Sequence, residues 1–183
     1  VVNRVNELSP NMVAITGDLV DGTVAQLSEH VRPLSRLKST YGTYFTTGNH
    51  EYYSGADQWI KFLESIDIRV LRNEHLTLRH NGTPMDVIGV DDWTAKNFGG
   101  DHGHDIEKAV SGRVDDRVGI LLAHQPRSID DAAKANIDLV LSGHTHGGQL
   151  WPFRFAVKLV QPYLEGLHRH SERTQIFVHR GTG

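Results

Sequence analysis

The sequence predicts one layered α/β domain in which short buried strands alternate with amphipathic helices. Short apolar runs recur along the chain, and stretches with apolar residues at helical spacing separate several of them. Four of these runs end directly in polar residues of the kind that bind ligands, as strands do at the binding edge of layered α/β proteins. Because 183 residues suffice for one sizeable core, we expect a single domain over residues 1–183.

The first half of the chain predicts three helices and two strands. Apolar residues recur at helical spacing over residues 1–8, 23–38 and 59–66, which predicts a helix in each segment. Residues 12–16 and 41–47 are short runs rich in apolar and β-branched residues and predict buried strands. A helical pattern already under way at the first residue, and an apolar run just before the last, lead us to expect a fragment with further structure beyond both ends.

The second half is richer in strands. Asn81-Gly82 stands between two strand-like runs and is a strong hairpin signal. Strands are predicted over residues 70–71, 76–78, 85–90, 118–123, 137–141 and 176–179, and helices over residues 106–110 and 128–135.

The composition excludes several kinds of function. The formal net charge is −3 and there is no basic stripe, which argues against a nucleic-acid partner. A chain without cysteine has no disulfide, no thiolate nucleophile and no cysteine-type zinc site. No apolar run is long enough to span a bilayer. The 12 histidines, by contrast, are candidates for metal binding and for proton transfer near neutral pH.

Two polar clusters follow the strands predicted in the first half. Gly17-Asp18-Leu19-Val20-Asp21-Gly22 places a carboxylate at a strand end after a glycine, where it can bridge two cations. Taken alone, such a sequence more often forms an ordinary turn. Gly48-Asn49-His50-Glu51 offers a neutral oxygen ligand beside a near-neutral proton donor. A glycine turn with a surface histidine explains that second motif equally well when it is considered alone.

Two further clusters are histidines at strand ends. His124 follows the strand predicted at residues 118–123, and a lone histidine there is more often a hydrogen-bonded structural residue than a ligand. His144 and His146 stand two residues apart before Gly147-Gly148, so both imidazoles can face one cavity. Because ligands bind beyond the carboxyl ends of strands, we expect all four clusters to converge on one site.

Together, these clusters resemble four of the five ordered motifs of calcineurin-like metallophosphoesterases, and the resemblance covers nearly the whole chain. It implies an α/β/β/α sandwich that hydrolyses phosphomonoesters or phosphodiesters at a dinuclear metal centre, with a metal-activated hydroxide as the nucleophile. The nitrogen and oxygen donors of the motifs suit Mn²⁺, Fe or Zn²⁺.

The resemblance also assigns metal ligands residue by residue. It implies that Asp18 bridges two divalent metals and that Asn49, His124 and His144 complete the second metal site. His146 would bind the first metal.

The same resemblance implies that His50 protonates the leaving oxygen and that Asp21 orients His50. The family opens with an Asp-x-His motif at the end of its first strand, and no such motif precedes Asp18 in this chain. Asp101-His102 and His104-Asp105 come too late in the sequence and lie in a polar loop. We therefore interpret the N-terminal strand as missing upstream of residue 1, which leaves the first metal site incomplete.

Substrate class is defined mainly by what the motifs lack. Protein serine/threonine phosphatases of the family carry an arginine after the second aspartate of the Gly-Asp motif, where this chain has Gly22. The motifs are more similar to those of bacterial members, some of them membrane-anchored, that act on small or lipid-linked phosphodiesters. Aromatic residues 151–155 would then form a membrane-facing lip or a substrate wall, although an apolar loop packed on the core explains them more simply.

Other polar residues allow weaker predictions. Asp91 and Asp92 follow another strand and can face the same pocket. A group of basic residues near the C-terminus either steers a phosphate or forms a solvated turn, and it comprises His168, Arg169, His170 and Arg173.

We expect a metal-dependent phosphoric ester hydrolase with a small-molecule or lipid-linked phosphoester as its substrate. The alternative is a metal-binding or interaction module with little turnover, which the incomplete first metal site favours for this fragment alone. We expect no nucleic-acid partner and infer no obligate protein partner. Peripheral contact with a membrane is one alternative. A cytoplasmic or membrane-associated location in bacteria is expected over secretion.

Overall fold

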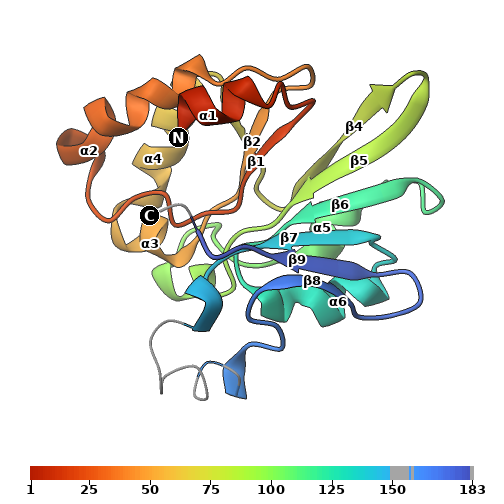
Figure 1. Ribbon diagram of the computed structural model, residues 1–183. Helices are drawn as coiled ribbons and strands as arrows, with labels where there is room; N and C mark the ends of the chain where they lie inside the picture. Colours follow the sequence, from red (N-terminus) through yellow and green to blue (C-terminus); the bar gives the residue numbers. More distant parts are fainter. Residues whose placement is uncertain (149–156, 158, 182–183) are drawn as a thin grey trace.

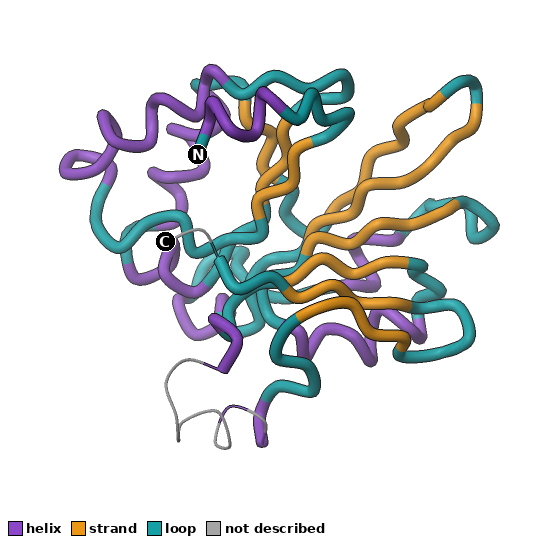
Figure 2. The backbone as a smooth tube through the Cα atoms, in the orientation of Figure 1, coloured by secondary structure: helices purple, strands orange, loops and turns teal. Residues whose placement is uncertain are grey.

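The computed structural model describes residues 1–148, 157 and 159–181, and its elements are stacked in layers (Figures 1 and 2). The first sheet contains three parallel strands in the order β1 (Val13–Ile15), β2 (Thr43–Phe45) and β3 (Ile68–Val70). The helices α1 (Val2–Glu7), α2 (Val24–Val31) and α4 (Ala56–Ser65) lie on the outer side of this sheet (Figure 1).

The second sheet contains six strands in the order β4-β5-β6-β7-β9-β8. Its central strands β5, β6, β7 and β9 run parallel, whereas β4 and β8 pair antiparallel at the two edges. The helices α5 (Ile106–Val110) and α6 (Ile129–Lys134) cover the outer face of this sheet (Figure 1). The bounds of the strands are β4 (Glu74–His80), β5 (Thr83–Gly89), β6 (Val118–Leu122), β7 (Leu139–Ser142), β8 (Gly166–Arg169) and β9 (Gln175–Val178).

Alternating side chains of the strands build three apolar layers. Ile15 and Phe45 pack with the helices of the first layer, whereas their neighbours Ala14 and Tyr44 pack against the second sheet. The layer between the two sheets contains Met12, Ala14, Tyr44, Leu71, Leu76, Leu78, Val87, Leu122 and Leu141. The outer layer under α5 and α6 includes Ile88, Ile106, Leu121, Ile129, Val140 and Ile176. This arrangement confirms the α/β/β/α sandwich expected from the sequence.

Three local features differ from the sequence predictions. The helix expected over residues 23–38 ends at Val31 and continues as the 3₁₀ segment η1 (Arg32–Arg36), because the ring of Pro33 and its missing N–H do not suit an α-helix interior. Asn49 starts a short helix, α3 (Asn49–Tyr53), that the polar motif did not indicate. β8 was also not predicted, since its alternating exposed residues carry little apolar signal.

Only two of the C-terminal basic residues, His170 and Arg173, lie in the turn considered above, which joins β8 to β9. His168 and Arg169 lie on β8, and only the connection to β9 is a turn. Arg173 is paired with Asp138, with its Nε 2.9 Å from the carboxylate Oδ1. Its guanidinium is therefore already neutralised by an acidic partner.

The parallel strands of both sheets direct their carboxyl ends to one edge of the sandwich, where the two sheets meet (Figure 1). The residues that follow β1, β2, β6 and β7 are the four polar clusters singled out in the sequence. None of the helices in the described ranges is long and apolar enough to cross a membrane. The aromatic residues 151–155 lie outside the described residues.

Candidate metal centre

Two turns, one after β1 and one after β2, come into direct contact. A Cβ added to Gly17 would lie 2.3 Å from the backbone nitrogen of Gly48, and one added to Gly48 would lie 2.3 Å from Oδ1 of Asp18. Only glycine permits this approach at both positions. Asp18 itself has a φ of +53°, an uncommon conformation for a residue with a side chain. The contact places the Asp18 carboxylate beside the N-terminus of α3.

Glu51 holds the two turns together. Its side chain is only 1% exposed, and its carboxylate accepts three backbone hydrogen bonds. The donors are the N–H groups of Gly48 at 2.6 Å, Asp18 at 2.9 Å and Leu19 at 2.8 Å. Burial raises the pKa of Glu51, although the three N–H donors favour the carboxylate. The residue therefore acts as a structural clamp beneath the metal centre, a role that the sequence motif alone did not reveal.

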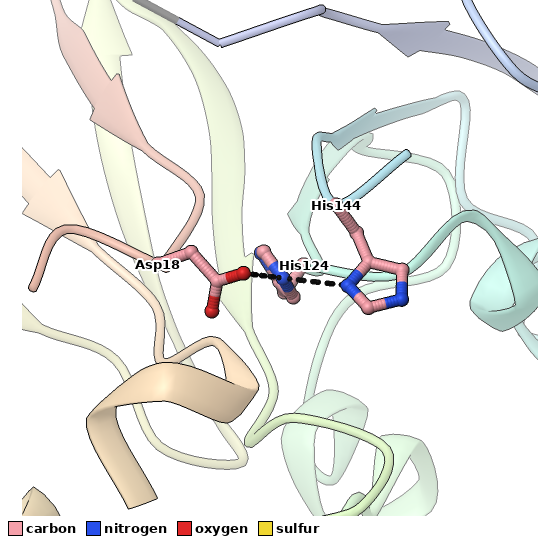
Figure 3. Close-up of side chains that lie close together, drawn as sticks. All are labelled: Asp18, His124 and His144. Atoms are coloured by element: carbon pink, nitrogen blue, oxygen red, sulfur yellow. Dashed lines mark hydrogen bonds and ion pairs between the residues drawn. The ribbon is translucent and has the colours of Figure 1, made fainter. Parts of the chain in front are cut away.

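Asp18, His124 and His144 form a cluster at the point where the sheets meet (Figure 3). Oδ2 of Asp18 lies 2.9 Å from Nε2 of His124, and that nitrogen lies 3.0 Å from Nδ1 of His144. Ligand atoms about 2.1 Å from one ion are about 3 Å apart when they subtend a right angle. One donor atom from each of the three side chains lies within 4.8 Å of the others. This spacing fits three ligands of one cation.

The protonation of His124 is set by the neighbouring sheet. Its Nδ1 lies 2.7 Å from the carbonyl oxygen of Thr16, which can only accept a hydrogen bond, so Nδ1 carries the proton. Nε2 therefore faces Asp18 and His144 with a lone pair when the ring is neutral.

The pKa shifts of the three clustered side chains indicate a site where a cation and a proton compete for the same ligand atoms. Burial alone lowers the pKa of His124, but the Asp18 carboxylate raises it above its ordinary value. Burial by itself raises the pKa of Asp18, and the hydrogen bond and charge of His124 hold it below its ordinary value. Burial and the nearby His124 lower the pKa of His144 to about 4, which leaves its ring neutral and able to bind a metal.

Asn49 provides an independent test of whether these residues suit a metal. Its Oδ1 is buried and has no hydrogen-bond partner among the described residues. Buried acceptors are seldom left without a partner, because the lost hydration costs free energy. Asn49 directly follows Gly48, and the next residue, His50, donates its backbone N–H to Oδ1 of Asp18 at 2.9 Å. A cation shared with Asp18 would satisfy this oxygen, so the residues present fit a metal.

The remaining predicted residues lie around this cluster. Nδ1 of His50 is 3.2 Å from Oδ1 of Asp21, and both side chains reach solvent. His146 is exposed and is not one of the clustered ligands, and it stands two residues after His144. One edge of the sandwich therefore holds the clustered ligands, Asn49 and the His50–Asp21 pair. His146 lies at the border of this site.

Three further residues border the site. Asp92 is 1% exposed, accepts a hydrogen bond from Gln125 at 3.0 Å, and acts electrostatically on His124 and His144. Asp91 instead forms a two-pronged ion pair with Arg72, at 2.9 and 2.7 Å, and so has a structural partner. His179 follows β9 directly. The strand predicted at residues 176–179 included His179, so the residue was missed, and a position just beyond a strand end was the signal that could have found it.

Comparisons with known proteins agree with this geometry. Residues 1–148 match the Calcineurin-like phosphoesterase family. A metallophosphoesterase of Helicobacter pylori strain J99 is 45% identical over 184 residues, covering 100% of this chain and 48% of its own length. A Danio rerio transmembrane protein with a metallophosphoesterase domain is 42% identical, covering 100% of this chain and 44% of its own length.

The chain thus spans about half the length of these relatives. The solved structure of Haemophilus influenzae NAD nucleotidase superposes with a TM-score of 0.63 at 20% identity, covering 98% of this chain and 42% of that protein, which supports the fold. The motif order, the two-sheet sandwich and the clustered ligands all agree with the family match. The chain belongs to the calcineurin-like phosphoesterase family.

Proposed function

We propose that this protein hydrolyses phosphomonoesters or phosphodiesters at a two-metal centre. The observation that carries the proposal is the meeting of Asp18, His124 and His144, together with the buried Oδ1 of Asn49 that no described residue satisfies. These four residues would hold one metal, and Asp18 with His146 would contribute to a second. When bound, such a pair of metals supplies an activated hydroxide and neutralises charge on the phosphoryl oxygens.

The protein's own proton donor would be His50. Its side chain is 39% exposed, so a substrate can reach the ring, while its backbone N–H is fixed on the Asp18 carboxylate. Asp21 accepts from Nδ1 of His50, so the proton for the leaving oxygen would come from Nε2 of the doubly protonated ring, which is then left neutral with its proton on Nδ1. Tyr53 packs edge-on against the His50 ring, with ring centres 5.5 Å apart.

The natural substrate is proposed to be a small or lipid-linked phosphoester. The Danio rerio relative is named as a transmembrane protein, which supports a membrane-associated location for the whole protein. The competing function is a metal-binding module with little turnover. Binding of Mn²⁺ without hydrolysis of phosphoesters would identify this competing function.

The test compares His50→Ala with wild type on bis-p-nitrophenyl phosphate and on an alkyl phosphodiester, both with added Mn²⁺. General acid catalysis contributes about 10²–10⁴-fold, and the contribution grows as the leaving group becomes poorer. We therefore expect a sharp loss on the aryl ester and a larger loss on the alkyl ester. The exposed His30 on α2 provides the control His30→Ala, which should leave both rates unchanged. Equal rates for His50→Ala and wild type on both esters would remove His50 from the mechanism.

A further inference from the structure

β9 also ends at the metal centre, and the residue after it is His179. The backbone N–H of His179 donates to the carbonyl oxygen of Ser142 at 2.9 Å, which aligns the end of β9 with the end of β7. The His179 ring lies over Gly143, where an added Cβ would be 2.9 Å from Cε1 and 3.0 Å from Nε2 of the ring. The glycine that precedes His144 therefore leaves room for the His179 ring.

Both ring nitrogens of His179 have partners. The backbone N–H of Gly181 donates to Nδ1 at 3.0 Å, so Nδ1 carries no proton. Nε2 must then carry the proton and donate to the hydroxyl oxygen of Thr16, 2.7 Å away. Burial lowers the pKa of His179, and the nearby His124 and His146 lower it further, which agrees with a neutral ring.

Thr16 connects His179 to a metal ligand. It is only 3% exposed and directly precedes Gly17-Asp18. While its hydroxyl accepts from His179, its carbonyl oxygen accepts from Nδ1 of His124 at 2.7 Å. A continuous path of two hydrogen bonds and one buried residue thus runs from the end of β9 to His124.

We propose that His179 is a positioning residue of the metal centre, which fixes Thr16 so that the Thr16 carbonyl holds His124 in its ligating orientation. The inference rests on the proposed function, because it assumes that His124 binds a metal. His179 is not itself a ligand in this arrangement, since neither ring nitrogen is free. The groups that orient metal-binding histidines affect affinity by about 10–100-fold when they are removed.

The test measures affinity for Co²⁺ and the visible absorption of bound Co²⁺, which reports ligand geometry independently of turnover. His179→Phe keeps a ring of similar shape but cannot donate to Thr16, and we expect about 10–100-fold weaker Co²⁺ binding with an altered spectrum. His179→Gln can still reach Thr16 with its amide N–H, and we expect it to restore most of the affinity. His75→Phe is the matched control, because His75 on β4 also bonds one backbone carbonyl, that of Ala109 at 2.8 Å, outside the metal centre.

Thr16→Val tests the same path from the other side. Because Thr16 and His179 act in series, the double variant Thr16→Val/His179→Phe should bind Co²⁺ no more weakly than the weaker single variant. If His179→Phe does not fold, Thr16→Val carries the test alone. Wild-type affinity and spectrum in both His179→Phe and Thr16→Val would overturn the inference. A wild-type protein that binds no Co²⁺ would instead overturn the proposed function on which the inference rests.

Discussion

Asn49→Ala is expected to change stability differently with and without metal. The buried Oδ1 of Asn49 has no hydrogen-bond partner among the described residues, and a buried acceptor in that condition costs about 1–3 kcal/mol. Alanine removes this cost, which offsets the lost packing of the small side chain. In EDTA, the variant should therefore unfold at the same temperature as the wild type or at a higher one.

With metal the sign reverses. At a free Mn²⁺ concentration of about 100 times Kd, binding stabilises the wild type by about 2.7 kcal/mol. Loss of one ligand that weakens binding about 10-fold reduces this to about 1.4 kcal/mol at the same concentration. Since 1 kcal/mol shifts Tm by about 2–4 °C in a domain of this size, the rise in Tm on adding Mn²⁺ should fall from about 5–11 °C to about 3–6 °C.

The assay is thermal unfolding followed by circular dichroism over a series of Mn²⁺ concentrations. Asn97→Ala is the control, because Asn97 is exposed in the 3₁₀ segment η2 (Ala95–Phe98) and is not one of the clustered ligands. A variant that loses several degrees in EDTA yet keeps the full Mn²⁺-dependent rise would refute the assignment of Asn49 as a ligand. That result would mean that its side chain serves the fold and not the metal.

Two further predictions concern carboxylates outside the clustered ligands, and the exposed α4 residue in Glu64→Gln is the shared control. Glu51→Gln leaves at least one of the three backbone N–H donors without an acceptor. The unfolding free energy should therefore fall by about 1–3 kcal/mol, and Mn²⁺ binding should weaken. A free energy of urea unfolding equal to that of the control variant would contradict the role of Glu51 as a clamp. For Asp138, burial alone raises the pKa, but the Arg173 guanidinium and the N–H of Gly119 hold it below the ordinary value of 3.8. Its stabilising effect is therefore present above pH 3.8 and lost as the pH falls through the lower folded-state pKa, so Asp138→Asn should cost about 0.2–1 kcal/mol at pH 7 and nothing in strong acid. A cost that is independent of pH would show that the Asp138 charge is not its source.

The sequence predicted the strands that carry the site with good accuracy. Strand predictions at residues 12–16 and 118–123 agree with β1 (Val13–Ile15) and β6 (Val118–Leu122), because buried parallel strands leave short apolar runs that few other structures share. The rule that ligands follow strand ends predicts Asp18 and His124 from the sequence alone. Residue type and strand-end position are local properties, and a sequence records them directly.

The tertiary structure decided the properties that depend on partners distant in sequence. The sequence of the Gly-Asn-His-Glu motif does not show what Glu51 does. Its hydrogen bonds to residues 32 and 33 positions away make it a clamp. Likewise, the link from His179 to Thr16 crosses 163 positions and joins the two sheets. Hydrogen-bond partners across a sandwich depend on how the sheets pack, and local sequence patterns contain no information about that packing.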